Sequence, residues 1–190
     1  HLDGRFVVLY AGAHGLSNDL EIVLQSADLL RDQPHILFAL VGDGKEKAAL
    51  QAYALEHQLS NVAFFPPVPK TEMASVLAAA DACLAILKPI ELYKTTYPNK
   101  VFDYLAAGKP VVLAIDGEIR KVVDQAGAGI FAQPGDPQAL AQAVRTLAAD
   151  PQAAQRMGAA GRAYVAAHFN RAALSDQLAL LLEEMRRVHA

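Results

Sequence analysis

Residues 97–115 carry the sequence Tyr-Pro-Asn-Lys-Val-Phe-Asp-Tyr-Leu-Ala-Ala-Gly-Lys-Pro-Val-Val-Leu-Ala-Ile, which reads as a loop, a short helix and a strand in immediate succession. Pro98 suits the first position of the helix, where a missing N–H has no cost. Gly108 suits the left-handed position just past the helix end. Pro110 then opens an apolar strand over residues 111–115. A helix that passes through one glycine into a buried strand is typical of parallel α/β proteins.

The start of this helix also has the features of a phosphate site. Free amides and the positive end of the dipole at a helix N-terminus favour a bound anion. Lys100 lies in the first turn, where a lysine is unfavourable unless an anion binds beside it. Asp103, one turn later, offers acceptors for two neighbouring hydroxyls, as on a ribose. These residues predict a nucleotide site, and the alternative is an ordinary surface helix between two strands.

Short apolar runs alternate with helical patterns along the whole chain. The runs predict six strands, at residues 6–11, 36–41, 62–65, 82–87, 111–115 and 130–132. Helices are expected at residues 17–31, 45–57, 71–80, 98–107, 118–125, from 137 onward, 151–168 and 171–188. Continuous apolar strands without hairpin turns favour a parallel sheet covered on both faces. We therefore expect one α/β domain over residues 1–190, a doubly wound, Rossmann-like parallel sheet of about six strands with extra C-terminal helices.

The last expected helix, residues 171–188, has no strand after it. Its apolar residues recur at helical spacing and form a broad stripe: Leu174, Leu178, Leu181, Leu182 and Met185. We expect this stripe to lack support from the rest of the chain, and packing on the flank of its own sheet is the alternative. The chain also begins without methionine, which predicts that it is a piece of a longer protein.

Glycines mark the ends of two expected strands, where ligands of an open parallel sheet bind. Gly12 and Gly15 follow the first strand, and Gly42 follows the second. Each predicts a close approach of the backbone to a phosphate or a sugar, with a plain strand-to-helix turn as the alternative. His14 is expected to be solvated in its turn. Asp43 is expected to cap the next helix.

The connection over residues 88–97 is long for an α/β protein, and long connections are often functional. It contains Glu91, Thr95 and Thr96, and its hydroxyl-rich end adjoins the expected phosphate site. We therefore expect this connection to form part of the site.

Composition argues against several other classes of function. A net charge of -3 and a pI near 6.1 give no support for binding to nucleic acid or to an anionic membrane surface. The single cysteine, Cys83, lies in an apolar run and is expected to be a buried strand residue, not a nucleophile. The six histidines are scattered, so neither a metal site nor another cofactor is expected. No apolar run reaches the length of a membrane span, and a cytoplasmic location is expected.

With these residues in view, the chain resembles the C-terminal, donor-binding domain of a two-domain (GT-B type) retaining glycosyltransferase of group 1, also called family four. The resemblance extends over nearly the whole chain. Its landmarks include Tyr-Ala-Gly at residues 10–12, Leu-Val-Gly-Asp-Gly at 40–44, Asn-Val-Ala-Phe at 61–64, residues 103–112 and Ala-Gly-Ala-Gly at 126–129. Residues 98–104 resemble the branch that makes bacterial surface polysaccharides, whose donors are often UDP-linked sugars.

The family's usual signature is two glutamates eight positions apart. Asp103 matches the second, which implies that it holds the ribose hydroxyls. Thr95 stands at the first position, which in the family contacts the donor sugar. Two replacements are open: the carboxylate of Glu91, or the hydroxyls of Thr95 and Thr96. The resemblance implies that Lys100 and Asp103 are the catalytic residues, with Lys100 at the pyrophosphate. The implied donor-binding residues are Gly12, Gly15, Gly42, Thr95, Thr96, Pro98, Asn99, Lys100 and Asp103.

The resemblance implies a hexosyl- or N-acetylhexosaminyl-type glycosyltransferase that uses a nucleotide-sugar donor, expected to be UDP-linked, in polysaccharide or glycolipid biosynthesis. The acceptor would bind to a missing N-terminal domain, so the chain alone is expected to be inactive. Peripheral contact with a membrane is expected only through that missing half. Two alternatives stay open: the nucleotide-sugar domain of an epimerase with the same twin-Rossmann architecture, and a non-catalytic sugar-nucleotide binding module.

Overall fold

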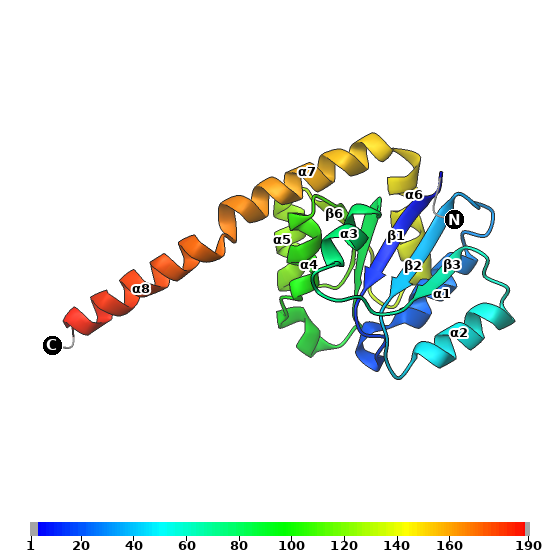
Figure 1. Cartoon of the computed structure of the whole chain (residues 1–190), viewed down its shortest axis with the longest axis horizontal. Helices are drawn as coiled ribbons and strands as arrows, with labels where there is room; N and C mark the ends of the chain where they lie inside the picture. Colours follow the sequence, from blue (N-terminus) through cyan, green and yellow to red (C-terminus); the bar gives the residue numbers. More distant parts are fainter. Residues whose placement is uncertain (1–3, 189–190) are drawn as a thin grey trace.

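A computed structural model describes residues 4–188, with side chains for 4–170 and 175–187, and contains one six-stranded sheet (Figure 1). Its strands are β1 (Phe6–Ala11), β2 (Ile36–Val41), β3 (Val62–Phe65), β4 (Ala82–Ile86), β5 (Val111–Ala114) and β6 (Gly129–Phe131). They lie in the order β3-β2-β1-β4-β5-β6, and every pairing is parallel. This order confirms the doubly wound, Rossmann-like sheet predicted from the apolar runs.

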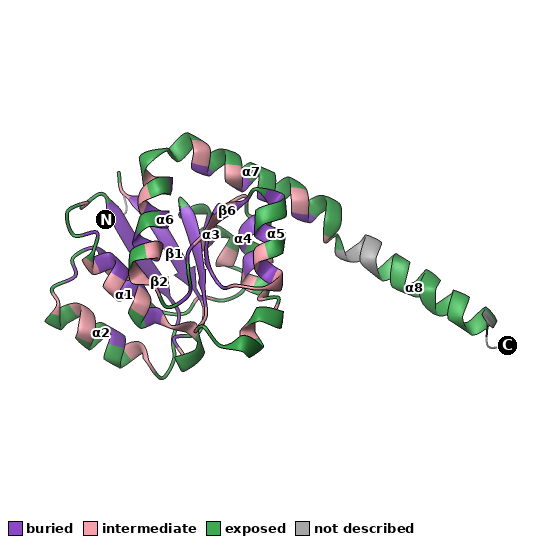
Figure 2. Ribbon diagram, turned by 180° about the vertical axis from the view of Figure 1, so that it is seen from behind, coloured by how far each residue is buried: buried purple, intermediate pink, exposed green. Residues whose placement is uncertain are grey.

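Helices cover both faces of the sheet (Figure 2). One face packs against α1 (Leu20–Asp28), α2 (Lys47–Glu56) and α6 (Pro137–Ala149), and the other against α3 (Met73–Ala78), α4 (Asn99–Ala106) and α5 (Glu118–Ala126). The long helix α7 (Pro151–His168) contributes Ala154 to the first core and Val165 to the second. Because side chains of β1, β2, β4 and β5 alternate between two cores, these strands are buried along their whole length.

The strand order reverses at the centre of the sheet, where β1 pairs with β2 on one side and with β4 on the other. The connections that follow these two strands leave toward opposite sides of the sheet. A crevice opens between such connections at the carboxyl ends of the strands, and ligands of this fold class bind there. Ala11 ends β1 and Ile86 ends β4 at this edge.

The helices differ from the predicted boundaries by up to three residues, at their starts and at their ends. A short 3-10 helix, η1 (Leu16–Asn18), replaces the first turn predicted for α1. Asp19 then has a left-handed backbone (φ 48°), which separates η1 from α1. A left-handed residue cannot continue a right-handed helix, so α1 begins at Leu20 instead of residue 17.

The prediction that Asp43 caps α2 is wrong. Its Oδ1 accepts a hydrogen bond from the adjacent Gly44 N–H (2.8 Å), and α2 begins only after Glu46, which forms no side-chain cap. The tight turn places Asp43 too far from the amides of the first helical turn. By contrast, Asp136 accepts hydrogen bonds from the Gln138 and Ala139 amides, a cap at the start of α6.

The last helix, α8 (Arg171–Val188), extends as an arm away from the sheet (Figure 1). Its large apolar side chains are exposed: Leu178, Leu180, Leu181, Leu182 and Met185. The side chain of Leu174, which belongs to the predicted stripe, lies outside the described residues. Within residues 4–188, no helix combines the length and the apolarity that a membrane crossing requires.

Candidate functional site

The helix α4 begins at the carboxyl edge of the sheet, directly after Pro98. The prediction that Pro98 is the first helical residue is wrong. Pro98 lies one position before the helix, with an extended backbone (φ -63°, ψ 119°) and no side-chain cap. Asn99 therefore opens the helix, and the loop delivers it in an extended conformation that the proline ring tolerates. Gly108 has the predicted left-handed backbone (φ 70°) after the helix end.

Lys100 points from the first turn of α4 toward the end of β1. Its Nζ lies 4.1 Å from the centre of the Tyr10 ring, and a methyl group on Gly12 would lie only 2.7 Å from Nζ. The side chain forms no hydrogen bond or ion pair with the residues that the structure describes. Burial lowers the pKa of Lys100 to about 8. The ammonium therefore lies against the Gly12 backbone without an anionic partner.

Gly12 and Gly42 hold the turns after β1 and β2 against each other. Both have positive φ (152° and 146°), and a methyl group on Gly42 would lie 1.9 Å from the Gly12 carbonyl oxygen. Only glycine permits this approach. Gly15 differs, because its backbone is extended (φ -115°) and a methyl group there would meet only Asn18 Nδ2, at 3.8 Å.

His14 is fully buried between these turns, so the prediction of a solvated histidine is wrong. Its backbone N–H donates to Asp43 O and its carbonyl accepts from Glu46 N, and these bonds draw the ring inward. Neither ring nitrogen has a hydrogen-bond partner among the described residues. Burial first, and the positive charge of Lys47 second, lower the pKa of His14.

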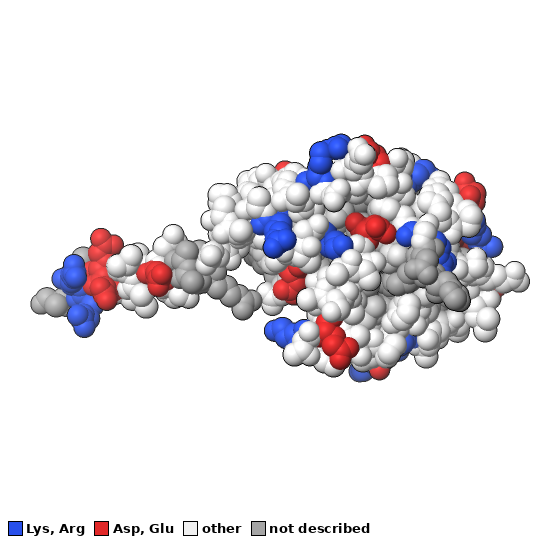
Figure 3. Space-filling model, turned by 45° about the horizontal axis from the view of Figure 1, so that its top comes forward, with Lys and Arg blue, Asp and Glu red and all other residues white. Residues whose placement is uncertain are grey.

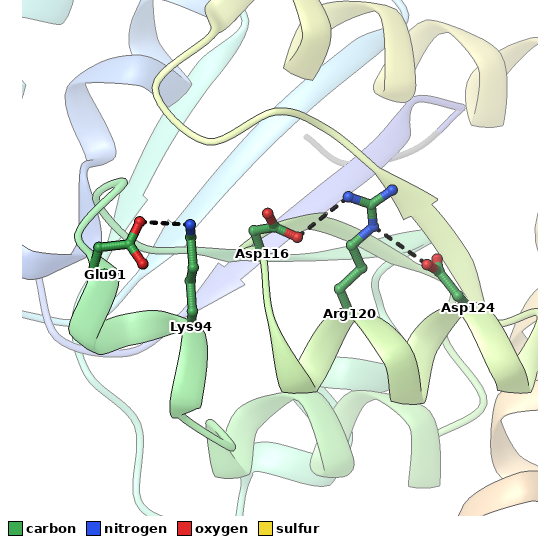
Figure 4. A network of polar contacts seen from close by, with 5 residues as sticks. All are labelled: Glu91, Lys94, Asp116, Arg120 and Asp124. Carbon is green, nitrogen blue, oxygen red and sulfur yellow. Dashed lines mark hydrogen bonds and ion pairs between the residues drawn. The ribbon is translucent and has the colours of Figure 1, made fainter.

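The long connection after β4 contains a 3-10 helix, η2 (Glu91–Thr95). The Thr95 hydroxyl donates to Leu92 O (3.0 Å) and the Thr96 hydroxyl donates to Tyr93 O (2.8 Å). Both threonines therefore stabilise their own turn, although each hydroxyl oxygen can still accept. Glu91 forms an ion pair with Lys94 (2.6 Å) at the exposed side of η2 (Figure 4).

A polar network after β5 lies beside η2 (Figure 4). Arg120 contacts Asp116 and Asp124 at 3.3 Å each, and its guanidinium lies 3.7 Å from the centre of the Phe131 ring. A hydrogen bond from the Gly117 amide, and then Arg120, lower the pKa of Asp116. The sequence analysis did not identify this network, although carboxylates four residues before and after an arginine are a recognisable signal on a helix.

A small hollow of about 150 Å³ separates η2 from the turn after β5, and both Glu91 and Asp116 line it. Gly117 makes the two segments fit, because a methyl group there would lie 2.0 Å from Lys94 O. Glu91 and Asp116, each ion-paired to a neighbouring cation, thus border one space at the carboxyl edge of the sheet.

Asp103 lies on the exposed side of α4, in a larger hollow of about 750 Å³ between α4 and α7. Asn99 and Phe102 line the same hollow, together with Lys70 and Arg162. Over the face seen in Figure 3, acidic and basic side chains are interspersed without a large patch of one sign. Any anion site here must therefore be built from a few local groups.

The structure brings the predicted residues together in three places. Gly12, Gly42 and Lys100 meet at the turns after β1 and β2. Asn99 and Asp103 share the hollow beside α4, whereas Thr95 is the last residue of η2 and Thr96 follows it directly. Three residues that were not identified from the sequence hold these segments in position: Tyr10, Tyr104 and Arg120. The Tyr104 hydroxyl, for example, accepts a hydrogen bond from Ala11 N at 3.2 Å.

An all-parallel, doubly wound sheet with glycine turns and a helix start at its switch point defines the class of nucleotide-binding α/β domains. Comparison with known proteins specifies the family. The sequence profile of the family "Glycosyl transferases group 1" matches residues 5–150, and the chain belongs to this family.

Two relatives are bacterial proteins that are described as probable or putative glycosyltransferases. The chain is 29% identical to the probable glycosyltransferase WbjE of Pseudomonas aeruginosa over 74% of this chain and 35% of that protein. It is 30% identical to the putative colanic acid biosynthesis glycosyl transferase WcaI of Escherichia coli K12, over 75% of this chain and 35% of that protein. The chain thus spans about a third of the length of these relatives.

Solved structures share the fold over almost the whole chain. Anabaena Alr3699/HepE, crystallised with UDP, superposes with a TM-score of 0.85 at 21% identity, over 96% of this chain and 50% of that one. Sucrose-phosphate synthase from Thermosynechococcus elongatus superposes with a TM-score of 0.84 at 24% identity, over 99% of this chain and 47% of that one. These superpositions match this domain to about half of each larger protein.

Proposed function

We propose that this chain is the donor-binding part of a glycosyltransferase that transfers a hexosyl or N-acetylhexosaminyl group from a UDP-sugar. The observation that carries the proposal is the Lys100 ammonium, held without an anionic partner beside Gly12 and next to the start of α4. Family membership supports a transferase over an epimerase or a binding module. The complex of Alr3699/HepE with UDP supports uridine as the nucleoside of the donor.

In this proposal the diphosphate binds between the start of α4 and the turn at Gly12. The first amides of α4 and the positive end of its dipole attract the anion, and Lys100 adds a full charge. Gly12 leaves room for the phosphate oxygens to approach the backbone. In a transferase these groups would stabilise the negative charge that develops on the departing nucleoside diphosphate.

The two hollows suit the two ends of the donor. The ribose would lie in the larger hollow, where the carboxylate of Asp103 accepts hydrogen bonds from its hydroxyls. The sugar would lie toward the smaller hollow, where Glu91 and Asp116 offer carboxylates in place of the acidic residue that position 95 lacks. Pro98 and Asn99 would contact the diphosphate between them.

The rest of the enzyme is part of the same proposal. Because the chain spans about a third of its curated relatives, we place the acceptor site in a further domain and expect the chain alone to be inactive. The relative named for colanic acid biosynthesis, WcaI, favours a polysaccharide or glycolipid acceptor. We place the enzyme in the cytoplasm, with any peripheral membrane contact made by the further domain.

Calorimetric titration of the chain with UDP tests the donor site. Lys100→Met removes the charge but keeps most of the volume, and Asp103→Asn removes the charge of the ribose acceptor. Each should cost about 1.5–3 kcal/mol of binding free energy, because a hydrogen bond to a charged group is lost. Arg145→Met, on α6, serves as the control and should bind UDP as the unmodified chain does. Unchanged affinity in both site variants would place the nucleotide elsewhere.

A further inference from the structure

Tyr10 lies directly beneath the Lys100 ammonium. It is the fifth residue of β1, fully buried, and its ring centre is 4.1 Å from Nζ. Its hydroxyl donates to Ala13 O (2.8 Å), within the turn that contains Gly12. A methyl group on Gly12 would lie 2.7 Å from Lys100 Nζ and 3.3 Å from Tyr10 Oη, so both groups border the same glycine.

The ring face is the main electrostatic partner of this ammonium. Aromatic rings attract a cation within about 6 Å of their centre, and the attraction strengthens when the cation is partly desolvated. No carboxylate of the described chain forms an ion pair with Lys100, and Asp103, one turn further along α4, lines the larger hollow. The turn after β2 carries two charged groups, but the Asp43 carboxylate accepts from the Gly44 amide and the Lys47 ammonium donates to Gly42 O. Of the other titratable neighbours, His14 is buried, and the Tyr104 hydroxyl is hydrogen-bonded to the Ala11 backbone.

Without the ring, several rotamers would be open to a lysine side chain in the first turn of a helix. With it, Nζ is held against the Gly12 backbone, at the switch point between β1 and β4. A charge that is positioned before the ligand arrives loses less entropy on binding. The ring therefore has a role in addition to filling the core.

We infer that Tyr10 is the positioning residue for Lys100, and that its ring face, not its hydroxyl, holds the ammonium where a nucleoside diphosphate binds. The inference rests on the proposed donor site. It assigns no contact between Tyr10 and the ligand, because Tyr10 is buried beneath Lys100.

A double-mutant cycle measures the role directly, with UDP as the probe. Tyr10→Leu removes the ring and should weaken UDP binding roughly three- to tenfold, since a partly desolvated cation–π contact is lost. Tyr10→Phe keeps the ring and should restore affinity to within about twofold of the unmodified chain. In the Lys100→Met background, Tyr10→Leu should have no further effect. Tyr53→Leu, on the outer helix α2, controls for the loss of a tyrosine elsewhere.

Equal weakening by Tyr10→Leu in both backgrounds would overturn the inference, because Tyr10 would then act only through the core. So would failure of Tyr10→Phe to restore binding. If the unmodified chain does not bind UDP at all, the proposed donor site itself is wrong. That result differs from one in which UDP binds but the effect of Tyr10→Leu does not depend on Lys100, which overturns only the role of Tyr10.

A second measurement needs neither UDP nor a core variant. In the unmodified chain labelled with ¹³C-lysine, the ε-methylene protons of Lys100 should be shifted upfield by the Tyr10 ring, and Lys100→Met identifies their signal. The exposed Lys45 supplies the reference position. An ε-methylene signal of Lys100 at the position of Lys45 would show that the ammonium does not lie over the ring, and would overturn the inference.

Discussion

Lys100 combines two properties that rarely occur together in a lysine. It is half-buried, and its ammonium lies beside the Tyr10 ring and the Gly12 backbone with no ion-pair partner among the residues that the structure describes. Burial of a charge without a counter-ion costs free energy, which is why burial lowers its pKa to about 8. An anion that enters the site would remove this cost, so the arrangement favours a ligand with negative charge.

The lowered pKa of Lys100 makes UDP binding depend on pH. An anion stabilises the protonated lysine, so binding raises the pKa again and the complex takes up a proton. Above pH 8 the free chain loses this proton, and the UDP affinity should fall by up to about tenfold per pH unit. Below pH 8 the ammonium is already protonated, so the affinity should be nearly constant down to about pH 7. Calorimetry from pH 7 to 9.5 checks this profile.

Lys100→Met supplies the control for the pH profile, because this variant should bind UDP more weakly and its UDP affinity should change little between pH 7 and 9.5. Titrations at pH 8 in two buffers with different ionisation enthalpies should also show net proton uptake by the unmodified chain. A profile of the same shape in both proteins would assign the pH dependence to another group.

At the residue scale, the sequence makes Lys100 a candidate for the site, but it does not predict the contacts of this side chain. Lys100 is a candidate because a lysine is unfavourable in the first turn of a helix. Its position over Tyr10 depends on how α4 packs against β1, which no local pattern encodes. His14 illustrates the same limit, because its burial follows from the approach of two glycine turns far apart in sequence.

At the scale of elements, strands were easier to predict than helix ends. Apolar runs set the bounds of β1 and β2 because each of their side chains enters one of two cores, and they also set those of the half-buried β3, whose last residue, Phe65, is exposed. Helix starts were harder to predict: α1 begins only after the left-handed Asp19, and α2 only after Glu46, which forms no side-chain cap. The strand β6 begins one residue early, at Gly129, where a methyl group would lie 2.0 Å from Val111 O.

The helix α8 is the element with the least support. Five of its large apolar side chains are exposed, and most helical stability in proteins comes from tertiary packing of such an apolar face. In the isolated, monomeric chain we expect the amides of α8 to exchange with deuterium much faster than those of β5. Hydrogen exchange with mass spectrometry checks this, with analytical ultracentrifugation to establish the monomer. Protection of α8 equal to that of β5 in a proven monomer would mean that the helix needs no partner.

At the scale of the whole molecule, the candidate site occupies one edge of the sheet. The chain covers about half the length of Alr3699/HepE and of sucrose-phosphate synthase, and about a third of the length of WbjE and WcaI. We therefore expect a further domain to close over the carboxyl edge, where it would exclude water from the diphosphate and strengthen its contact with Lys100. The exposed face of α8 is a candidate surface for that domain.

A crystal structure of the chain with UDP tests the central claim most directly. The account predicts a diphosphate oxygen within hydrogen-bond distance of Lys100 Nζ, further oxygens at the first amides of α4, and ribose hydroxyls on Asp103. A UDP molecule bound away from the start of α4, with Lys100 and Asp103 both free of contact, would contradict it.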